Sequence, residues 1–130
     1  MPDRAARTIL AFDFGLKRIG VAVGERELGT AHPLRAIQRF DEIPALIEEW
    51  TPAALVVGRP TSAQGESHDM TRRAEDFARR LERQFKLPVA RVDERYTSVE
   101  AESRLRGAKR KPVDSVAAQL LLEQYFHEAA

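Results

Sequence analysis

Hydrophobic residues fall into five short runs of strand length, separated by stretches with helical periodicity. The first two runs flank a turn that contains Gly15, which is typical of a β-hairpin. The third run contains Pro33, which lacks a backbone donor and favours an edge strand or a bulge. The fourth, AALVV, is continuous and suits a strand buried on both faces. The runs occupy residues 8–15, 19–23, 28–37, 53–57 and 87–92.

The intervening stretches predict helices, of which 67–86 is the longest. Its apolar residues form one stripe, and its arginines are expected to form a solvated face. Asp41 is expected to cap a short helix, Thr97 another, and Pro112 can open the last one. The order β-β-β-α-β-α-β-α-α predicts an α/β fold with a mixed five-stranded sheet, three antiparallel strands and then two parallel ones, and helices on its faces. The stripe predicted for the last helix is Val113, Val116, Ala117, Leu120 and Leu121.

Composition narrows the classes of protein and partner. A chain of 130 residues suggests a single domain, 1–130. The absence of Cys excludes disulfides, thiolate metal sites and a Cys nucleophile. No apolar run approaches a membrane span and the first residues do not resemble a signal peptide, so we expect a cytoplasmic protein with no membrane contact. The net charge is only +1, so any contact with a polyanion must depend on local clusters of cations.

Three carboxylates stand out by their positions. Asp13 lies inside the first apolar run, Glu94 follows the last strand, and Asp114 lies in the first turn of the last helix. If the first and last strands are close in the sheet, the three can converge, and carboxylate oxygens are the ligands that Mg²⁺ and Mn²⁺ prefer. Two such ions can activate a water and stabilise the leaving oxygen in phosphodiester cleavage. Purely structural roles are the alternatives: a turn cap for Asp13, an ion pair with Arg95 for Glu94, and a helix-dipole interaction for Asp114.

Cationic residues provide the candidate contacts to nucleic acid. Lys17 and Arg18 follow Asp13 at the mouth of the hairpin, and Arg95 follows Glu94. Five of the eight residues in 104–111 are cationic, and contacts from such side chains to phosphates position a strand without reading its sequence. A solvated loop is the alternative for this cluster. Its cationic members are Arg104, Arg106, Lys109, Arg110 and Lys111.

Four segments, in order and across nearly the whole chain, resemble the YqgF/RuvX family. They are DFGLKRIGVAVG at 13–24, GRP…G at 58–65, VDERYTSVEAE at 92–102 and VDSVAAQLLLEQYF at 113–126. The resemblance implies an RNase H-like fold and a bacterial nuclease associated with maturation of the 5′ end of pre-16S ribosomal RNA. It places the family's catalytic and metal-binding acids at Asp13, Glu94 and Asp114. Arg59 and Tyr96 depart from the family pattern, as do residues 61–64, which leaves the substrate preference open.

Three other functions fit parts of this pattern. The family is also described as a Holliday-junction resolvase, and a resolvase is expected to act as a homodimer because it cuts two symmetric strands. A non-catalytic RNA-binding assembly factor could keep the same fold. The strand and hairpin around Asp13 also resemble the phosphate loop of sugar-kinase and actin-like ATPases, but those proteins bind nucleotide between two such domains.

Replacing Lys109, Arg110 and Lys111 together by Ala is expected to weaken nucleic-acid binding similarly for all sequences. The dependence of log K on log salt should flatten by roughly 0.7–0.9 for each phosphate that is no longer neutralised, measured by anisotropy titrations at several salt concentrations. Cleavage at saturating substrate should persist. An unchanged salt slope would return the cluster to the role of a solvated loop.

Overall fold

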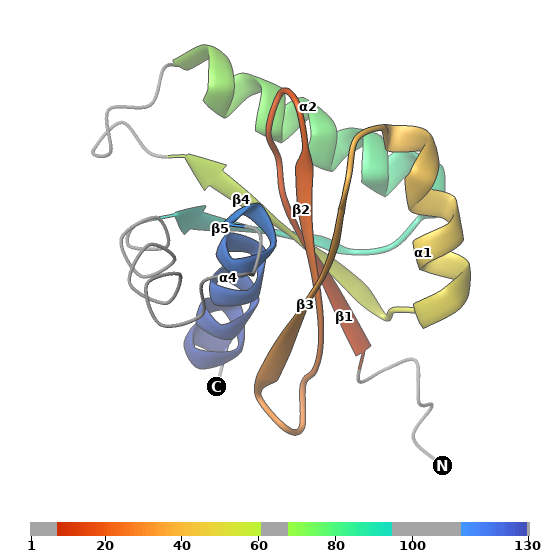
Figure 1. The fold of residues 1–130 in the computed structure, drawn as a ribbon, viewed down its shortest axis with the longest axis vertical. Coiled ribbons are helices and arrows are strands. Elements are labelled where there is room, and N and C mark those ends of the chain that lie inside the picture. The colour runs from red at the N-terminus through yellow and green to blue at the C-terminus, as the bar shows by residue number, and fades with distance from the viewer. Residues whose placement is uncertain (1–7, 61–67, 95–112, 130) are drawn as a thin grey trace.

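The computed structural model describes residues 8–60, 68–94 and 113–129, with the backbone alone at 68, 113, 114 and 129. Five strands and four helical segments lie in these ranges (Figure 1). The strands are β1 Thr8–Asp13, β2 Ile19–Glu25, β3 Thr30–Ile37, β4 Ala54–Pro60 and β5 Val89–Glu94. The helical segments are the short 3₁₀ helix η2 Phe40–Glu42 and the α-helices α1 Ile43–Trp50, α2 His68–Phe85 and α4 Val113–Ala129.

The strands form one mixed sheet in the order β3-β2-β1-β4-β5. β1 pairs antiparallel with β2, and β2 pairs antiparallel with β3. β4 is parallel to both β1 and β5. The predicted mixed sheet is therefore confirmed, and Pro33 lies on the edge strand β3, as expected. Because β1, β4 and β5 run in the same direction, their carboxyl ends meet at one edge of the sheet.

Helices cover both faces of this sheet (Figure 1). On one face α4 packs over a core that includes Ile9, Ala11 and Val56. On the other face α1 and α2 pack over a core that includes Leu10 and Phe12. Alternate residues of β1 therefore point to opposite layers, as the two-residue period of a strand requires. In the part of the chain that the structure describes, no helix is long and apolar enough to cross a membrane.

Three local predictions were wrong. β4 continues through Pro60, where a loop was predicted from Gly58 onward. Asp41 lies within η2, and the capping carboxylate is that of Glu42, which accepts hydrogen bonds from the backbone N–H groups of Gln38 at 2.7 Å and Arg39 at 2.9 Å. These two N–H groups hold the pKa of Glu42 below its usual value.

The third correction concerns α4. Ala117, predicted to be buried, is only half-buried, whereas Ala118 and Leu122 are fully buried against the sheet. α4 is apolar around much of its circumference, so its sequence period could not identify the face that meets the sheet.

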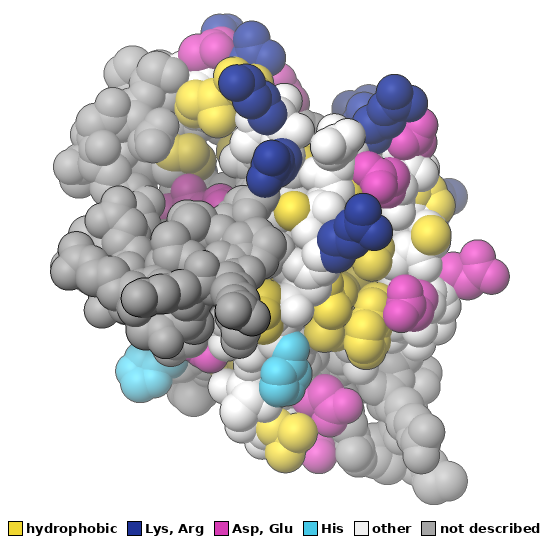
Figure 2. All heavy atoms as spheres, viewed as in Figure 1, with side chains coloured by type: hydrophobic (Ala, Val, Ile, Leu, Met, Phe, Trp, Pro, Cys, Tyr) yellow, Lys and Arg dark blue, Asp and Glu magenta, His cyan; other side chains and the backbone are white. Residues whose placement is uncertain are grey.

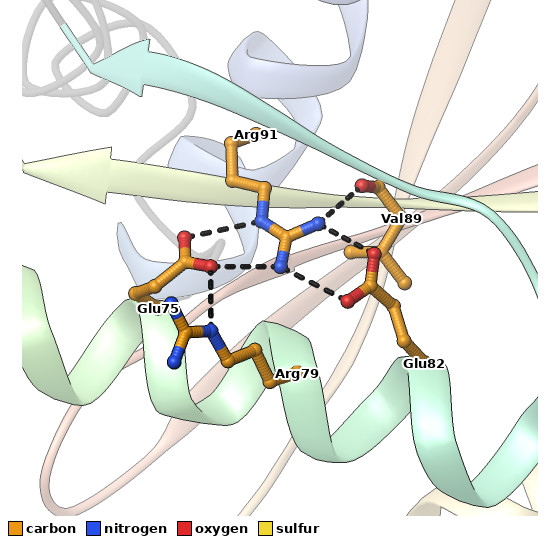
Figure 3. A network of polar contacts seen from close by, with 5 residues as sticks. All are labelled: Glu75, Arg79, Glu82, Val89 and Arg91. Carbon is orange, nitrogen blue, oxygen red and sulfur yellow. Dashed lines mark hydrogen bonds and ion pairs between the residues drawn. The ribbon is translucent and has the colours of Figure 1, made fainter.

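A charged network joins the edge strand β5 to α2 (Figure 3). Arg91 donates to Glu75 from Nε at 3.1 Å and from Nη2 at 2.8 Å, and to Glu82 from Nη1 at 2.7 Å. The two glutamates hold the pKa of Arg91 above its usual value, and Arg91 lowers the pKa of both carboxyls. Bidentate pairs of this kind orient the groups they join. Among the described strands β4 is the one neighbour of β5, so this network braces β5 from the helix layer.

Arg91→Met is expected to lower the free energy of unfolding by about 1–2 kcal/mol at neutral pH, because it leaves two partly buried carboxylates without their shared donor. Both glutamates have lowered pKa values in the folded protein, so their contribution is complete above the ordinary carboxyl pKa of 4.5 and is lost as the pH falls through the lowered values. The difference in the free energy of unfolding between wild type and variant should therefore shrink well below pH 4.5. Urea unfolding at neutral pH and at a pH well below 4.5 would measure it.

Arg79→Met is the matched control. Arg79 also contacts Glu75, at 3.3 Å, but its side chain is 64% exposed, so its removal should change stability by less than about 0.5 kcal/mol. Equal losses in the two variants would contradict a bracing role for Arg91.

Candidate active site

Asp13 is the last residue of β1 and follows four residues with no exposed surface, Ile9 to Phe12. It is half-buried. By the alternation of the strand it shares a face with Ile9 and Ala11, which pack toward α4. Its register partner on the other side is Gly20 of β2. The carboxylate therefore emerges at the end of a buried strand, on the α4 side of the sheet.

Glu94 is the last residue of β5 and shares the α4 face with Val92. Its carboxylate lies over the neighbouring strand, because a Cβ atom built on Gly58 of β4 would be 2.7 Å from Glu94 Oε1. Gly58 directly follows Val57, the register partner of Phe12 in β1. The Glu94 carboxylate thus lies over β4. The next strand in the sheet is β1, which carries Asp13 and is one strand spacing away, roughly 4.8 Å.

Asp114 lies in the first turn of α4, and its side chain is outside the described part of the structure. The next residue, Ser115, is almost fully buried and donates a hydrogen bond to the carbonyl oxygen of Leu34 in β3. Leu34 pairs with Val21, which pairs with Phe12. The hydrogen bond therefore anchors the start of α4 at the end of the sheet where β1 ends. Convergence of the three carboxylates stays a prediction.

Asp93, the neighbour of Glu94, belongs to the opposite face. Its Oδ1 accepts from Nε and Nη2 of Arg59, both at 2.9 Å. Its backbone carbonyl accepts from Nε2 of Gln124 on α4 at 3.0 Å. Sequence reasoning missed this ion pair, because a loop was predicted from Gly58 onward and only the structure places residues 59 and 93 in register on two parallel strands.

Lys17 and Arg18 are exposed in the connection between β1 and β2, immediately after Asp13. On the face shown in Figure 2, the visible Lys and Arg side chains lie in the upper half, the half that contains this connection in Figure 1. Asp and Glu side chains are interspersed with them in that half, so the described cations assigned to a polyanion at this end of the sheet are Lys17 and Arg18. The other predicted contacts, Arg95 and the cationic residues of 104–111, lie outside the described residues.

The described residues of the site fit a hard divalent cation. Asp13 and Glu94 supply carboxylate oxygens from one face of the sheet, and Gly58 between them has no side chain to fill the space. Among the residues whose side chains are described, no group of three His, Asp or Glu could hold a metal ion. A three-carboxylate site would therefore need a third side chain from outside this set, and Asp114 is the predicted one.

Comparison with known proteins identifies the family. A family model described as "RuvX: Holliday junction resolvase" matches residues 7–128. A protein of Nitrosomonas europaea is 50% identical over 97% of this chain and 95% of its own length. One of Dechloromonas aromatica is 53% identical over 92% of this chain and 90% of its own length. Both are named "Putative pre-16S rRNA nuclease". The chain belongs to the RuvX family.

Solved structures place the RuvX chain in a known fold. RuvC of T. thermophilus, in complex with a Holliday junction substrate, matches 95% of both chains with a TM-score of 0.61 at 13% identity. YeaZ from Pseudomonas aeruginosa matches 78% of this chain and 50% of its own, with a TM-score of 0.50 at 20% identity. At these identities the likeness shows the fold alone, and it confirms the RNase H-like fold.

Gly58→Ala is expected to displace the Glu94 carboxylate, because the added methyl group would also lie 2.9 Å from Leu121 Cδ2 and only side-chain ends can move. Mn²⁺ affinity, measured by isothermal titration calorimetry, should fall about tenfold or more, as for other changes that misplace a ligand. Overpacking should lower stability by about 1–2 kcal/mol.

Gly29→Ala is the matched control. Gly29 has a φ of +66° and nothing lies within 4 Å of a Cβ added there, so Ala would introduce backbone strain of about 1 kcal/mol without crowding any neighbour. Mn²⁺ affinity should not change in this variant. Unaltered Mn²⁺ affinity in folded Gly58→Ala would argue against Glu94 as a ligand.

Proposed function

We propose that this protein is a nuclease that hydrolyses phosphodiester bonds with a divalent cation, Mg²⁺ or Mn²⁺, held by Asp13, Glu94 and Asp114. The observation that carries the proposal is that Asp13 and Glu94 end two strands on the same face of the sheet, on either side of Gly58. Membership of the RuvX family and the nuclease names of its relatives support the same chemistry.

A pair of bound cations would supply an activated water and stabilisation of the leaving oxygen. The protein's own residues have three tasks. Asp13 and Glu94 present negative oxygens from strand ends that the buried sheet holds in place. Asp114 adds a third carboxylate from the start of α4. Lys17 and Arg18 contact phosphates of the nucleic-acid substrate and guide it to the carboxylates. Such contacts do not depend on the base sequence of the substrate.

The substrate that we propose is the 5′ end of pre-16S ribosomal RNA, in ribosome biogenesis. The names of the relatives support this choice. From this role we infer that the protein acts in the cytoplasm. Branched DNA is the second candidate, favoured by the description of the family model. It would require a homodimer, because a junction presents two symmetric strands.

Asp13→Asn keeps the side-chain volume but removes the charge that the cation needs. Cleavage of a pre-16S RNA fragment and of a four-way DNA junction should be measured with Mg²⁺ and with Mn²⁺. We expect the variant to lose cleavage by about a hundredfold or more, while its melting temperature shows that it is folded.

Asp93→Asn is the control, since Asp93 lies at the same end of the sheet but pairs with Arg59 on the other face. It should retain cleavage. Full cleavage by folded Asp13→Asn would remove Asp13 from the mechanism. If the wild-type protein binds RNA but cleaves neither substrate with either cation, the non-catalytic assembly factor becomes the better description.

A further inference from the structure

A groove of about 880 Å³ lies between the edge strand β3 and helix α1. It is separate from the carboxylates, which face α4. Cations line one wall, where Arg18 and Arg35 are both exposed. Trp50, Glu42 and Glu49 belong to the other wall, formed by η2 and α1. Leu46, which packs on the core, also lines the groove.

The cationic wall has unused binding capacity. Among the residues that the structure describes, neither Arg18 nor Arg35 forms a hydrogen bond or an ion pair. By contrast, Arg59, Arg79 and Arg91 are all engaged by carboxylates. Arg35 acts on Glu42 of the opposite wall only through its charge, which helps the backbone N–H groups to lower the pKa of that carboxyl, so the donors of both guanidinium groups are suited to the phosphates of a nucleic-acid strand.

The opposite wall fits bases. Trp50 is half-buried in the core and also lines the groove, so its ring is held in place by packing. Aromatic rings of this kind serve as stacking platforms for unpaired bases of any sequence. Carboxylates such as that of Glu49 can accept hydrogen bonds from amino groups of bases. The groove thus has cations on the wall that would face the sugar-phosphate backbone of a nucleic-acid strand and carboxylates on the wall that would face its bases.

The position of the groove links it to the candidate active site. Ile37 of β3 pairs with Ile19 of β2, next to Gly20, the register partner of Asp13. Two strand spacings separate the groove wall from the end of β1, about 10 Å. Arg18 belongs both to the groove and to the loop that follows Asp13. A nucleic-acid strand that leaves the carboxylates and passes over this loop would therefore enter the groove.

We propose that this groove binds unpaired nucleotides of the substrate that flank the cleaved bond, with Arg35 contacting a phosphate and Trp50 stacking on a base. The proposal rests on the proposed function, because it extends the same substrate beyond the carboxylates. The division of charge between the walls favours a nucleic-acid strand over a uniformly charged ligand.

Trp50 is the only tryptophan of the chain, so its fluorescence reports directly on the groove. The full protein, in EDTA to prevent cleavage, would be titrated with a short end-labelled oligocytidylate, whose bases carry the amino group that Glu49 can accept from. Trp50 emission and label anisotropy would be recorded in the same titration. We expect saturable quenching of Trp50 at the concentration where anisotropy rises. Arg35→Gln should lower the affinity about fivefold at about 0.1 M salt, as expected when one phosphate of a single strand is no longer neutralised.

Arg83→Gln is the matched control. Arg83 is an exposed arginine of α2 that borders the hollow formed with Arg79 and Glu82, on the side of α2 where Glu82 meets β5. This is away from the β3 edge, so the control should bind and quench as wild type does. Cleavage of the pre-16S fragment would be assayed in parallel.

Three results would overturn the proposal. The first is RNA binding by anisotropy without any change in Trp50 emission, which would place the strand elsewhere. The second is equal loss of affinity in the Arg35 and Arg83 variants. The third is a change in Trp50 emission on dilution of the protein alone, accompanied by a dimer in sedimentation, which would assign the groove to a second copy of the chain. If metal-dependent cleavage persists in any of these cases, the proposed nuclease function is retained and only the proposal that the groove binds nucleotides is rejected.

Discussion

The burial of β1 on both faces is the constraint on which the rest of the structure depends. Ile9 and Ala11 pack toward α4, Leu10 and Phe12 pack toward α1 and α2, and none of the four has exposed surface. A charged side chain within such a strand would lose its hydration without a partner. The first position where a carboxylate can reach polar surroundings is the strand end, which Asp13 occupies. The candidate chemistry is therefore located at one edge of the sheet by the packing of its centre.

The two-residue period of β5 divides its terminal acids between two roles. Asp93 points toward the α2 layer and binds Arg59, whereas Glu94 points toward α4 and lies over Gly58. A register shift of one residue would exchange these faces. The Arg91 network and the hydrogen bond from Gln124 to the Asp93 carbonyl act on this strand from opposite layers. β5, which pairs with a single strand in the described part of the chain, is thereby held in the register that presents Glu94.

The two faces of the sheet support different parts of the proposed activity. The α4 face carries the carboxylates, while the opposite face carries the α2 brace and the groove beside α1. The connection between β1 and β2 lies between them, with Lys17 and Arg18 exposed on it. A nucleic-acid strand bound along this connection would contact both faces. Mutations on the α4 face would then affect cleavage, and mutations in the groove would affect mainly binding.

The sequence alone determined the order of the described strands and helices, the hairpin, the edge position of Pro33 and the position of Glu94 at a strand end, whereas the helix predicted from Thr97 lies outside the described residues and Asp13, predicted inside the first strand, is its last residue. These features depend on local periodicity and on the chemistry of single residues, which a chain displays without its partners. The stripe on α2 was also readable, since Ala74, Phe77 and Leu81 are buried as expected.

Only the tertiary structure decided which elements meet. It extended β4 through Gly58, because pairing with β5 continues to Pro60 and Glu94. It selected Ala118 and Leu122 of α4 for the core, on a helix that is apolar on more than one side. It joined Arg91 to Glu75 and Glu82, two residues seven positions apart and hence on one face of α2. A sequence period identifies a face of an element but not its neighbour, because the neighbour depends on contacts between residues far apart in the chain.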